Sequence, residues 1–444
     1  MSKHLKSALY KSILLSMVVS LLGVTIALAA SGDLDTTFST DGRVTTDVNA
    51  VNPGRNDRPR GLALQTDGKI VAAGFSNAPS TAIYDFALTR YNTDGSLDSA
   101  FSGDGRLLTN FGGIDQAFAV AIQANGKIVA AGQKCDNTFT ICDVALARYN
   151  VGGALDTTFS TDGKQTTDFG GGDNGTLGGI AIQSNDKIIV AGYMWNGNNY
   201  DFAVYRYLSN GSLDTTFSGD GMVNFGFGAG RQDQPIDLAI QSDGKIVVAG
   251  FTGDADGNNN NFAVARLNAG GSLDTTFSID GRQTTNFGND EYAAGIALQS
   301  DGKIVLAGDK WNGTTDYFAL ARYTTSGNLD PTFNGTGKVV TSFTGIGQEA
   351  AAFDVIVQSD GKIVAFGQTT TGTITSNDFA LARYNANGSL DTTFSGDGKV
   401  RVDFGNQIDQ GYALALQPDG NYVLGGQSNS PTTGSDFALA RVLP

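Results

Sequence analysis

Histidine is almost absent from this chain, whose 444 residues include only His4. Without it, the sequence lacks the general base of Ser-His-Asp and Cys-His sites and the commonest ligand of zinc centres. Glutamate is nearly as scarce, because Glu291 and Glu349 are the only two among 44 acidic residues. Aspartate bonds to nearby backbone in turns whereas glutamate favours helices, so this acidity indicates turns. These shortages argue against most enzyme chemistries, and we predict that the protein is not an enzyme.

Long apolar runs are also missing, apart from one near the N-terminus. Three lysines, the last at Lys11, precede an uncharged and mostly apolar stretch at 13–28, and Ala27-Leu28-Ala29 offers the small residues that a signal peptidase needs. We predict a signal peptide at 1–29. An uncleaved membrane anchor is the alternative, but the stretch is shorter than the ~20 residues that span a bilayer. The mature protein should be secreted, periplasmic or at the extracellular surface, with no membrane insertion.

Basic residues are outnumbered by acidic ones. The predicted leader holds three of the 29 lysines and arginines, so the mature chain keeps 26 against 44 acidic residues, a net charge near −18. Such a chain repels phosphate groups, which argues against nucleic acid and anionic membranes as partners. We expect a monomer whose partner is a glycan or a protein at the cell exterior.

Cysteine occurs twice, at Cys135 and Cys142, with six residues between them. In an exported protein this pair predicts a disulfide that closes one loop. A pair of metal-binding thiolates is the alternative. It would need two more soft ligands from a mature chain that has no histidine and no further cysteine.

What the sequence does contain is repetition. Three motifs recur seven times each, in the same order, at intervals of about 60 residues. A Leu-Asp-x-x-Phe motif begins at Leu34, Leu97, Leu155, Leu213, Leu273, Leu329 and Leu390. A motif similar to DFALARY places its arginine at Arg90, Arg148, Arg206, Arg266, Arg322, Arg383 and Arg441. A motif similar to LQSDGKIVxAG places its glutamine at Gln65, Gln123, Gln183, Gln241, Gln299, Gln358 and Gln417.

Each repeat predicts four strands. In the first repeat, 61–65, 69–75 and 85–91 are the first three, and 42–48 is a copy of the fourth. Asp-Gly between the first two apolar runs is a strong hairpin signal, because both central residues must tolerate positive φ. No helical apolar period occurs after the leader, so the mature chain is predicted to be all-β.

Residues 30–444 are predicted to form a single seven-bladed β-propeller of four-stranded antiparallel blades. A four-stranded sheet cannot bury both faces alone, but in a ring it packs on two neighbours. A linear solenoid is the alternative, and it would need atypical capping repeats that are not seen here. The strand 42–48 lacks its three partners and the last repeat lacks its fourth strand. We therefore predict that 42–48 joins the C-terminal blade and closes the ring.

The repeats also resemble a known family. The pattern GSLDTTFSGDGKV…DGKIVxAG…DFALARYN is similar to the delta-60 repeat, which is grouped among β-propeller domains of unknown function in exported and surface proteins, chiefly bacterial. The resemblance covers essentially the whole mature chain. It implies a propeller and an extracytoplasmic location, and it implies no activity and no functional residues.

Variation among the repeats indicates where function lies. The first-to-second and third-to-fourth connections have constant lengths, whereas the second-to-third connections differ by up to two residues and the fourth-to-first by up to five. Because strand direction alternates, both variable connections should lie on one face of the ring. Binding residues concentrate on variable loops that a rigid scaffold holds, so we predict that this face carries the ligand site.

Several residues near this face are candidates for ligand binding. An acidic residue precedes the repeat glutamine by eight or nine positions in six repeats, at Asp57, Asp115, Asp233, Glu291, Glu349 and Asp409. These carboxylates could surround the central channel and hold a cation or an amine, or they could form structural hydrogen bonds at the start of the innermost strand. Trp195 and Trp311 share a Trp-Asn-Gly loop, and they could stack on sugar rings or pack against their own loops.

No cofactor is expected, with calcium as the alternative. The loop 253–261 places Asp254, Asp256 and Asn258 at alternate positions, like the opening of a calcium loop, but it lacks the bidentate glutamate, so we favour a polar hairpin. The repeated aspartates, such as Asp98 and Asp104, are predicted to be turn caps that pair with the third-strand arginines. Seven calcium sites are the alternative for that set.

The predicted function is a non-catalytic binding or adhesion module that recognises a glycan or a protein through the variable loops. A structural scaffold of an envelope or matrix is one alternative. A glycosidase or lyase that uses two carboxylates is another, with Glu291 and Glu349 as the pair.

Overall fold

In a computed structural model, the chain is described at residues 29–49, 56–77, 83–168, 176–343, 349–371, 373–405, 408–430 and 433–444. It divides into Met1–Ala30 and one compact unit, Ser31–Pro444, and the fold below is that of the second. The predicted signal peptide at 1–29 lies outside the described residues except for Ala29, so it stays a prediction. Within the described part of the chain, no helix has the length and apolar character needed to cross a membrane.

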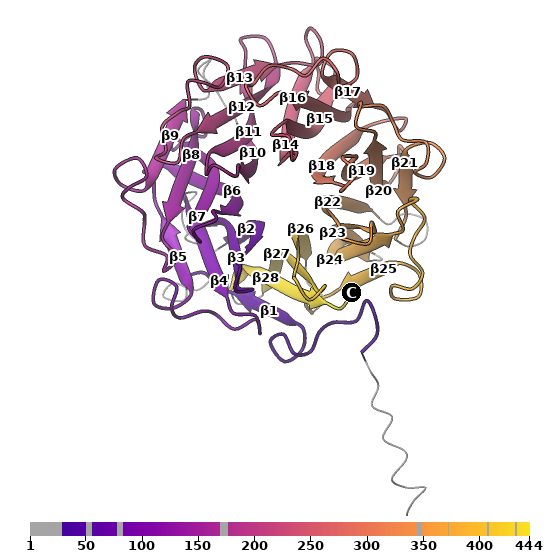
Figure 1. Cartoon of the computed structure of the whole chain (residues 1–444). Helices are drawn as coiled ribbons and strands as arrows, with labels where there is room; N and C mark the ends of the chain where they lie inside the picture. Colours follow the sequence, from indigo (N-terminus) through magenta and orange to yellow (C-terminus); the bar gives the residue numbers. More distant parts are fainter. Residues whose placement is uncertain are drawn as a thin grey trace, which may run out of the picture. The chain divides into compact units, whose positions relative to one another are not determined.

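Seven four-stranded antiparallel sheets make up this unit, with one strand at each of four positions counted outward from a central axis (Figure 1). The innermost strands are β2 (Asn56–Leu64), β6 (Ile114–Ile122), β10 (Thr176–Ile182), β14 (Gln232–Ile240), β18 (Glu291–Leu298), β22 (Ala350–Val357) and β26 (Asp409–Leu416). The second strands are β3 (Ile70–Asn77), β7 (Ile128–Cys135), β11 (Ile188–Trp195), β15 (Ile246–Gly253), β19 (Ile304–Trp311), β23 (Ile363–Thr371) and β27 (Tyr422–Ser430). The third strands are β4 (Tyr84–Tyr91), β8 (Cys142–Tyr149), β12 (Tyr200–Tyr207), β16 (Asn261–Leu267), β20 (Asp316–Tyr323), β24 (Thr373–Tyr384) and β28 (Gly434–Val442). The outermost strands are β5 (Arg106–Thr109), β9 (Lys164–Asp168), β13 (Met222–Phe225), β17 (Arg282–Thr285), β21 (Lys338–Thr341), β25 (Lys399–Val402) and β1 (Arg43–Thr46).

Blades 1 to 6 follow the chain as β2–β5, β6–β9, β10–β13, β14–β17, β18–β21 and β22–β25. Blade 7 combines β26, β27 and β28 with β1 from the other end of the unit. β1 pairs antiparallel with β28, from Arg43 opposite Ala440 to Thr46 opposite Phe437, and in Figure 1 the indigo strand lies beside the yellow one. The prediction of a seven-bladed propeller closed by its N-terminal strand is confirmed.

The turn beside this closure matches the equivalent turn of the other blades. Gly32 N donates to Leu443 O over 3.0 Å, just as Gly388 N donates to Asn385 O over 2.8 Å in blade 6. The chain runs through that turn in blade 6. In blade 7 the two ends of Ser31–Pro444 build the same turn from separate segments.

The core is divided among the seven blade interfaces. Second and third strands carry apolar side chains on both sides, since each blade is covered by a neighbour on either face. Between blades 1 and 2, for example, Phe86 and Leu88 of β4 pack in one cluster with Ala145 and Tyr149 of β8. The seven such clusters hold the ring together without a single large core.

A β-bulge interrupts every innermost strand at the same place. In blade 1 the register with β3 shifts between Pro59 and Gly61, which leaves Arg60 as the extra residue. The residue opposite is Gly74, where a Cβ atom would lie 2.0 Å from the carbonyl oxygen of Arg58. The bulge thus requires the glycine of the repeated Ala-Gly pair. It also explains why β2 begins at Asn56, five residues before the predicted start, because alternation cannot be followed through a bulge.

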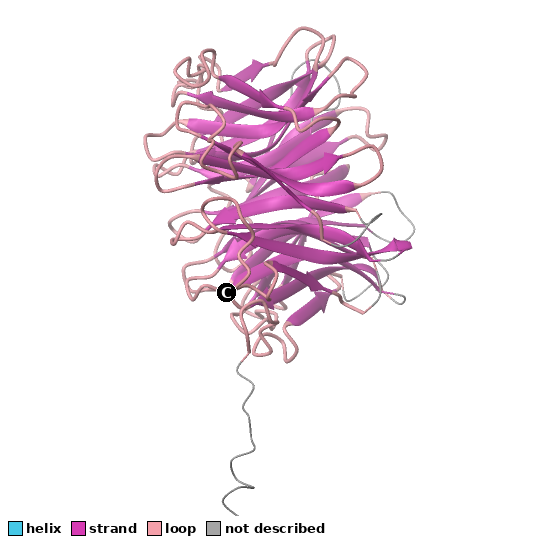
Figure 2. Ribbon diagram, turned by 90° about the vertical axis from the view of Figure 1, so that its right-hand side faces the viewer, coloured by secondary structure: helices cyan, strands magenta, loops and turns pink. Residues whose placement is uncertain are grey.

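Loops gather on the two sides of the ring, with the strands running between them (Figure 2). On one side Lys69, after the β2–β3 turn, binds Asp98 of the β4–β5 connection over 3.0 Å, so both constant connections share that face. The β3–β4 and β5–β6 connections leave the opposite ends of these antiparallel strands. We call the two sides the constant-loop face and the variable-loop face.

Candidate functional site

A cavity of about 460 Å³ lies at the centre of the ring and is lined by the innermost strands of all seven blades. The bulges build its wall, because a bulge redirects the extra side chain. The seven bulge residues all line the cavity: Arg60, Phe118, Gly178, Ile236, Ala294, Phe353 and Tyr412. Each precedes its repeat glutamine by five positions. One column of the repeat therefore supplies most of the chemical diversity of the cavity.

One side of the cavity is aromatic around a single cation. The Arg60 guanidinium carbon lies 4.0 Å from the ring centroid of Tyr412 and 5.7 Å from that of Phe75. The Tyr412 ring in turn lies 5.7 Å from Phe353, and the Phe75 ring 6.2 Å from Phe118. Blades 6, 7, 1 and 2 thus present a continuous belt of rings with Arg60 among them.

Arg60 has no counter-charge within the part of the chain that the structure describes. Its Nε has no hydrogen-bond partner among the described residues. Burial lowers the pKa of Arg60, and the side chains that further shift it are Tyr412 and Arg58 rather than a carboxylate. The side chain is half-buried and its Nε is fully covered, and a partly desolvated cation without a nearby anion is costly.

Two carboxyl groups also line the cavity. Asp237 and Asp354 directly follow the bulges of blades 4 and 6, where the other five blades have glycine or alanine. Asp237 accepts hydrogen bonds from the amides of Leu238 and Ile296, and Asp354 from those of Val355 and Leu414.

These two carboxyl groups hold their protons unusually tightly. Burial raises the pKa of each to about 7, and the charge of Asp354 raises that of Asp237 further. Near neutral pH the pair can therefore offer both a proton donor and an acceptor to a bound molecule.

Stability should fall as the pH rises from about 4 to 8. Between the unfolded pKa of 3.8 and the folded pKa of about 7, the folded state keeps protons on Asp237 and Asp354 that the unfolded state has lost. We expect the double variant Asp237→Asn, Asp354→Asn to reduce this loss by roughly a few kcal/mol at pH 8. The measurement is thermal unfolding at pH 5 and pH 8 with chelator present. Exposed turn residues of the same blades give the matched control, Asp243→Asn with Asp360→Asn, and equal slopes in both double variants would contradict the assignment.

The acidic residues predicted to surround the channel are placed differently. Five of them are fully buried at the start of an innermost strand, at Asp57, Asp115, Asp233, Glu291 and Asp409. Each accepts a backbone hydrogen bond from the preceding connection, from Val48, Phe111, Phe227, Asn289 and Phe404 respectively. These contacts are the structural hydrogen bonds that the sequence offered as one of two interpretations. None of the five carboxylates lines the central cavity.

Glu349, the sixth, is half-buried just before β22. Its backbone exchanges hydrogen bonds with Thr370, and the charge of its carboxylate raises the pKa of Asp316. Glu291 lies in the neighbouring blade with its carboxylate buried, and neither glutamate lines the cavity. The carboxylate pair facing a common cavity is Asp237 with Asp354.

The two tryptophans are not brought together. Trp195 ends β11 in blade 3 and Trp311 ends β19 in blade 5, so blade 4 stands between them. Both are half-buried: Trp195 packs against Tyr200 at 5.1 Å between ring centroids, and the Trp311 amide donates to Asp290 O. They lie at the variable-loop face and form no joint stacking surface.

The repeated aspartates take the turn-cap role. Asp98 accepts 2.7 Å and 3.0 Å hydrogen bonds from Arg90 and Lys69, and its other oxygen caps the Ala100 amide. The same ion pair between the third-strand arginine and this aspartate recurs in all seven blades. These contacts are those of the predicted turn caps, and calcium at these carboxylates stays an untested alternative that would have to displace the arginine.

The loop 253–261 is a polar hairpin. Asp254 accepts hydrogen bonds from the amides of Asp256 and Asn258 and from the Asn259 side chain. Both of its oxygens are used within the loop, as the hairpin interpretation requires. Calcium binding by this loop stays an untested prediction.

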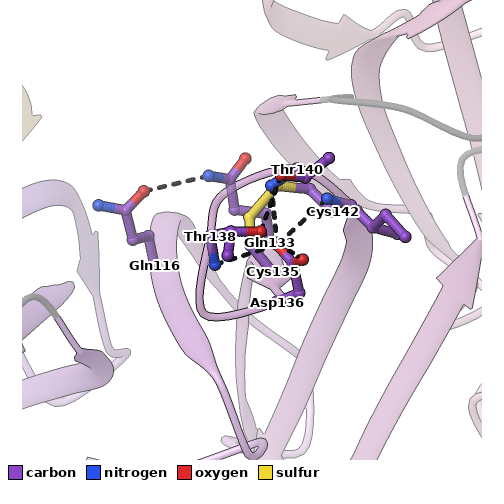
Figure 3. The surroundings of a disulfide bond; sticks show 8 residues. Gln116, Gln133, Cys135, Asp136, Thr138, Thr140 and Cys142 are labelled. Carbon is purple, nitrogen blue, oxygen red and sulfur yellow. Dashed lines mark hydrogen bonds between the residues drawn. A yellow bond between two sulfur atoms is a disulfide. The ribbon is translucent and has the colours of Figure 1, made fainter.

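The disulfide is present. Cys135 and Cys142 are opposite each other where the β7–β8 hairpin opens into its loop, and a bond joins their sulfur atoms (Figure 3). Asp136 caps this loop by accepting hydrogen bonds from the amides of Thr138 and Thr140. The bond closes one variable loop of blade 2.

Comparison with known families agrees with the repeat analysis. Six segments match the family described as "Domain of unknown function (DUF5122) beta-propeller", at residues 65–101, 123–159, 183–217, 241–277, 299–333 and 358–394. The repeats match a propeller family of unknown function. Each DUF5122 segment runs from the repeat glutamine to the phenylalanine of Leu-Asp-x-x-Phe. The resemblance is confirmed at this level, and the delta-60 name is not.

No curated protein matches the sequence. Among solved structures, the chain is similar to the polysaccharide lyase Uly1, with a TM-score of 0.46, 11% identity, and coverage of 86% of this chain and 89% of that one. It is similar to a PL25 ulvan lyase, with a TM-score of 0.45, 10% identity, and coverage of 93% and 94%. It is also similar to an α-L-arabinanase of Penicillium chrysogenum, with a TM-score of 0.43, 9% identity, and coverage of 93% and 98%. Likenesses this distant carry no argument about activity, and the prediction of a non-catalytic protein gains no support from them.

Proposed function

We propose that this protein binds an acidic saccharide in its central cavity, with the sugar carboxylate held by Arg60. The half-buried guanidinium, which has no anionic partner among the described residues, carries the proposal, because a carboxylate ligand would supply the missing charge through paired hydrogen bonds. A cavity of about 460 Å³ has room for one or two sugar rings.

The rest of the wall suits the same ligand. The rings of Phe118, Phe353 and Tyr412 offer flat apolar surface for the C–H face of a sugar. Asp237 and Asp354 can accept hydrogen bonds from hydroxyl groups of the ligand and donate hydrogen bonds to them. A ligand that reaches from Arg60 to the two carboxyl groups must carry an anionic group at one end and hydroxyls at the other. Export to the cell exterior, as the sequence predicts, fits such a ligand.

Calorimetric titration with a uronic-acid disaccharide and with its carboxyl-reduced form tests the proposal. We expect saturable binding of the acidic probe alone. Arg60→Gln should weaken this binding by about 10- to 100-fold, since a hydrogen-bonded charge pair contributes roughly 1.5–3 kcal/mol.

The control is Arg401→Gln, which removes an exposed arginine from β25 and should leave affinity unchanged. Equal binding of the neutral disaccharide, or undiminished affinity in a folded Arg60→Gln protein, would rule the proposal out. So would the absence of binding to any uronic-acid probe.

A second candidate function is hydrolysis of the bound saccharide. Asp237 and Asp354 favour it, because both face one cavity and hold pKa values of about 7, as a general acid requires. Release of reducing ends from the acidic disaccharide, lost in Asp237→Asn or Asp354→Asn but not in Asp243→Asn, would establish catalysis. Binding without turnover would leave the non-catalytic module as the function.

A further inference from the structure

Three carboxylates meet at the junction of blades 6 and 7, on the variable-loop face and away from the central cavity. Asp378 lies on β24, Asp403 directly follows β25, and Asp409 begins β26. One oxygen from each lies within 4.8 Å of the others. Asp378 and Asp409 are buried and Asp403 is partly exposed. We call these residues the blade 6–7 triad.

One member of the triad has an unsatisfied oxygen. Asp409 is fully buried, and its Oδ2 accepts a 2.8 Å hydrogen bond from the Phe404 amide. Its Oδ1 has no hydrogen-bond partner within the described chain. A buried anionic oxygen next to two other carboxylates is unfavourable unless a cation joins them.

Little positive charge from the protein reaches the triad. Arg401, whose charge acts on Asp378, is an exposed residue of β25. Arg43 binds the backbone carbonyl of Asp403 and pairs its side chain with Asp41. The Asp403 carboxylate accepts a 2.7 Å hydrogen bond from the Gly405 amide through Oδ1.

Other junctions show how the chain avoids such a cluster. Between blades 1 and 2, Asn110 takes the position of Asp403, and its amide donates to Asp85 over 2.7 Å. Between blades 3 and 4 the same position is Gly226, and Asn196 donates to the neighbouring Asp201 over 2.7 Å. These junctions have fewer acids or supply their own donors.

Between blades 4 and 5 two of the three positions are amides, Asn261 and Asn286. Burial raises the pKa of the third residue there, Glu291, and the charge of Lys310 opposes this rise. Only the junction of blades 7 and 1, with Asp436, Asp47 and Asp57, repeats the all-aspartate set within the described chain.

We propose that the blade 6–7 triad binds a calcium ion. The donors are all carboxylate oxygens, which are hard ligands that suit calcium, and the set includes none of the nitrogen or sulfur ligands that zinc prefers. Water completes the coordination at the partly exposed Asp403. The ion would tie β24 and β25 of blade 6 to the innermost strand of blade 7, next to the blade that closes the ring.

Calcium titration of chelator-treated protein tests this site. We expect one saturable binding event at the triad and a rise in the thermal midpoint, with magnesium much less effective. Asp403→Asn should weaken this event at least tenfold, and it changes the partly exposed member of the triad so that folding is preserved. Asp397→Asn, in the exposed turn of the same blade, is the matched control and should leave calcium affinity unchanged.

Three results would overturn the proposal. The first is the absence of saturable calcium binding by the chelator-treated parent. The second is equal calcium affinity in the Asp403→Asn and Asp397→Asn proteins. The third is a binding event abolished by Asp47→Asn but not by Asp403→Asn, which would place the ion at the junction of blades 7 and 1.

Discussion

A chain that starts at Asn49 and so lacks β1 is expected not to fold to a stable monomer, in contrast to its parent, 31–444. The deletion removes Phe38, which is fully buried, and Asp35, whose carboxylate binds Arg441 at 2.8 Å. Losing a buried phenylalanine costs about 3–5 kcal/mol, and leaving a buried arginine unpaired costs about as much again. Together these losses approach the about 5–15 kcal/mol that stabilises an ordinary protein. The deletion also exposes the edge of β28, which can then pair with a strand of another molecule.

A circular permutant provides the control for this deletion. In blade 6, seven positions separate Arg383 from Leu390, and a direct bond from Pro444 to Ser31 would place seven positions between Arg441 and Leu34. The permutant 49–444 joined without a linker to 31–48 should therefore rebuild blade 7 in one piece. We expect circular dichroism and size-exclusion chromatography to show a folded monomer for the permutant and an unfolded or aggregated truncation. A stable monomeric truncation would show that β1 is dispensable for closure.

The architecture was predictable because it depends on features that the sequence repeats. The seven copies of the arginine and of Leu-Asp-x-x-Phe give the blade count, and the unpaired strand at 42–48 gives the closure. Asp-Gly turns fix the first hairpin of five blades, with Asn-Gly in blade 2 and Asn-Asp in blade 3, and the second residue has positive φ, as at Gly68. Each of these signals is local in the sequence, and because every blade packs on its neighbours in the same way, few further contacts had to be predicted.

The central cavity was missed because bulges hide it. Alternation along a strand predicts which of the two faces of the sheet each side chain lies on. The extra residue at Arg60 shifts this alternation, so the prediction fails beyond the bulge. Two signals were nevertheless present. Aspartate replaces glycine or alanine at Asp237 and Asp354, and the column that contains Arg60 varies more than its neighbours. When one position of a repeated strand varies and the positions on either side vary less, its side chain faces the cavity and does not pack against the next blade.

The loop-based candidates were misplaced for a different reason. Spacing along the chain located Asp57 and its equivalents at the start of the innermost strands, which is where the structure has them. It could not tell that backbone amides such as Val48 N would enclose the carboxylates. Likewise, Trp195 and Trp311 share a motif, but two repeats of distance place a whole blade between them. Sequence similarity between repeats thus predicts equivalent positions and not proximity.

Replacing Asp156 by alanine is expected to lower the free energy of unfolding by about 3–5 kcal/mol, the cost of a buried charge left without its partner. Asp156 Oδ2 accepts 2.7 Å hydrogen bonds from both Arg148 and Lys127. The Arg148 guanidinium also lies 4.7 Å from the Phe159 ring centroid and donates to the Ser209 carbonyl of the next blade. Loss of the carboxylate therefore loosens one blade and its interface with the next. Urea unfolding at pH 7 measures the effect.

The control for this variant is Asp162→Ala, six residues further along the same connection. Asp162 is exposed, caps the Lys164 amide and pairs loosely with the Lys164 ammonium at 3.9 Å, so its removal should cost roughly 0–1 kcal/mol. The pH dependence separates the two roles as well. Burial alone would raise the pKa of Asp156, but hydrogen bonds from Lys127 and Thr158 and the charge of Arg148 lower it below the unfolded value of 3.8. Its contribution is therefore present above pH 4 and lost as the pH falls further, opposite in sign to that of Asp237 and Asp354. The free energy of unfolding of the parent should be highest near pH 5. Asp156→Ala should reduce the fall in stability below that pH and leave the fall above it unchanged. If the variant lost stability in acid as steeply as the parent, this ion pair would contribute nothing to the free energy of unfolding.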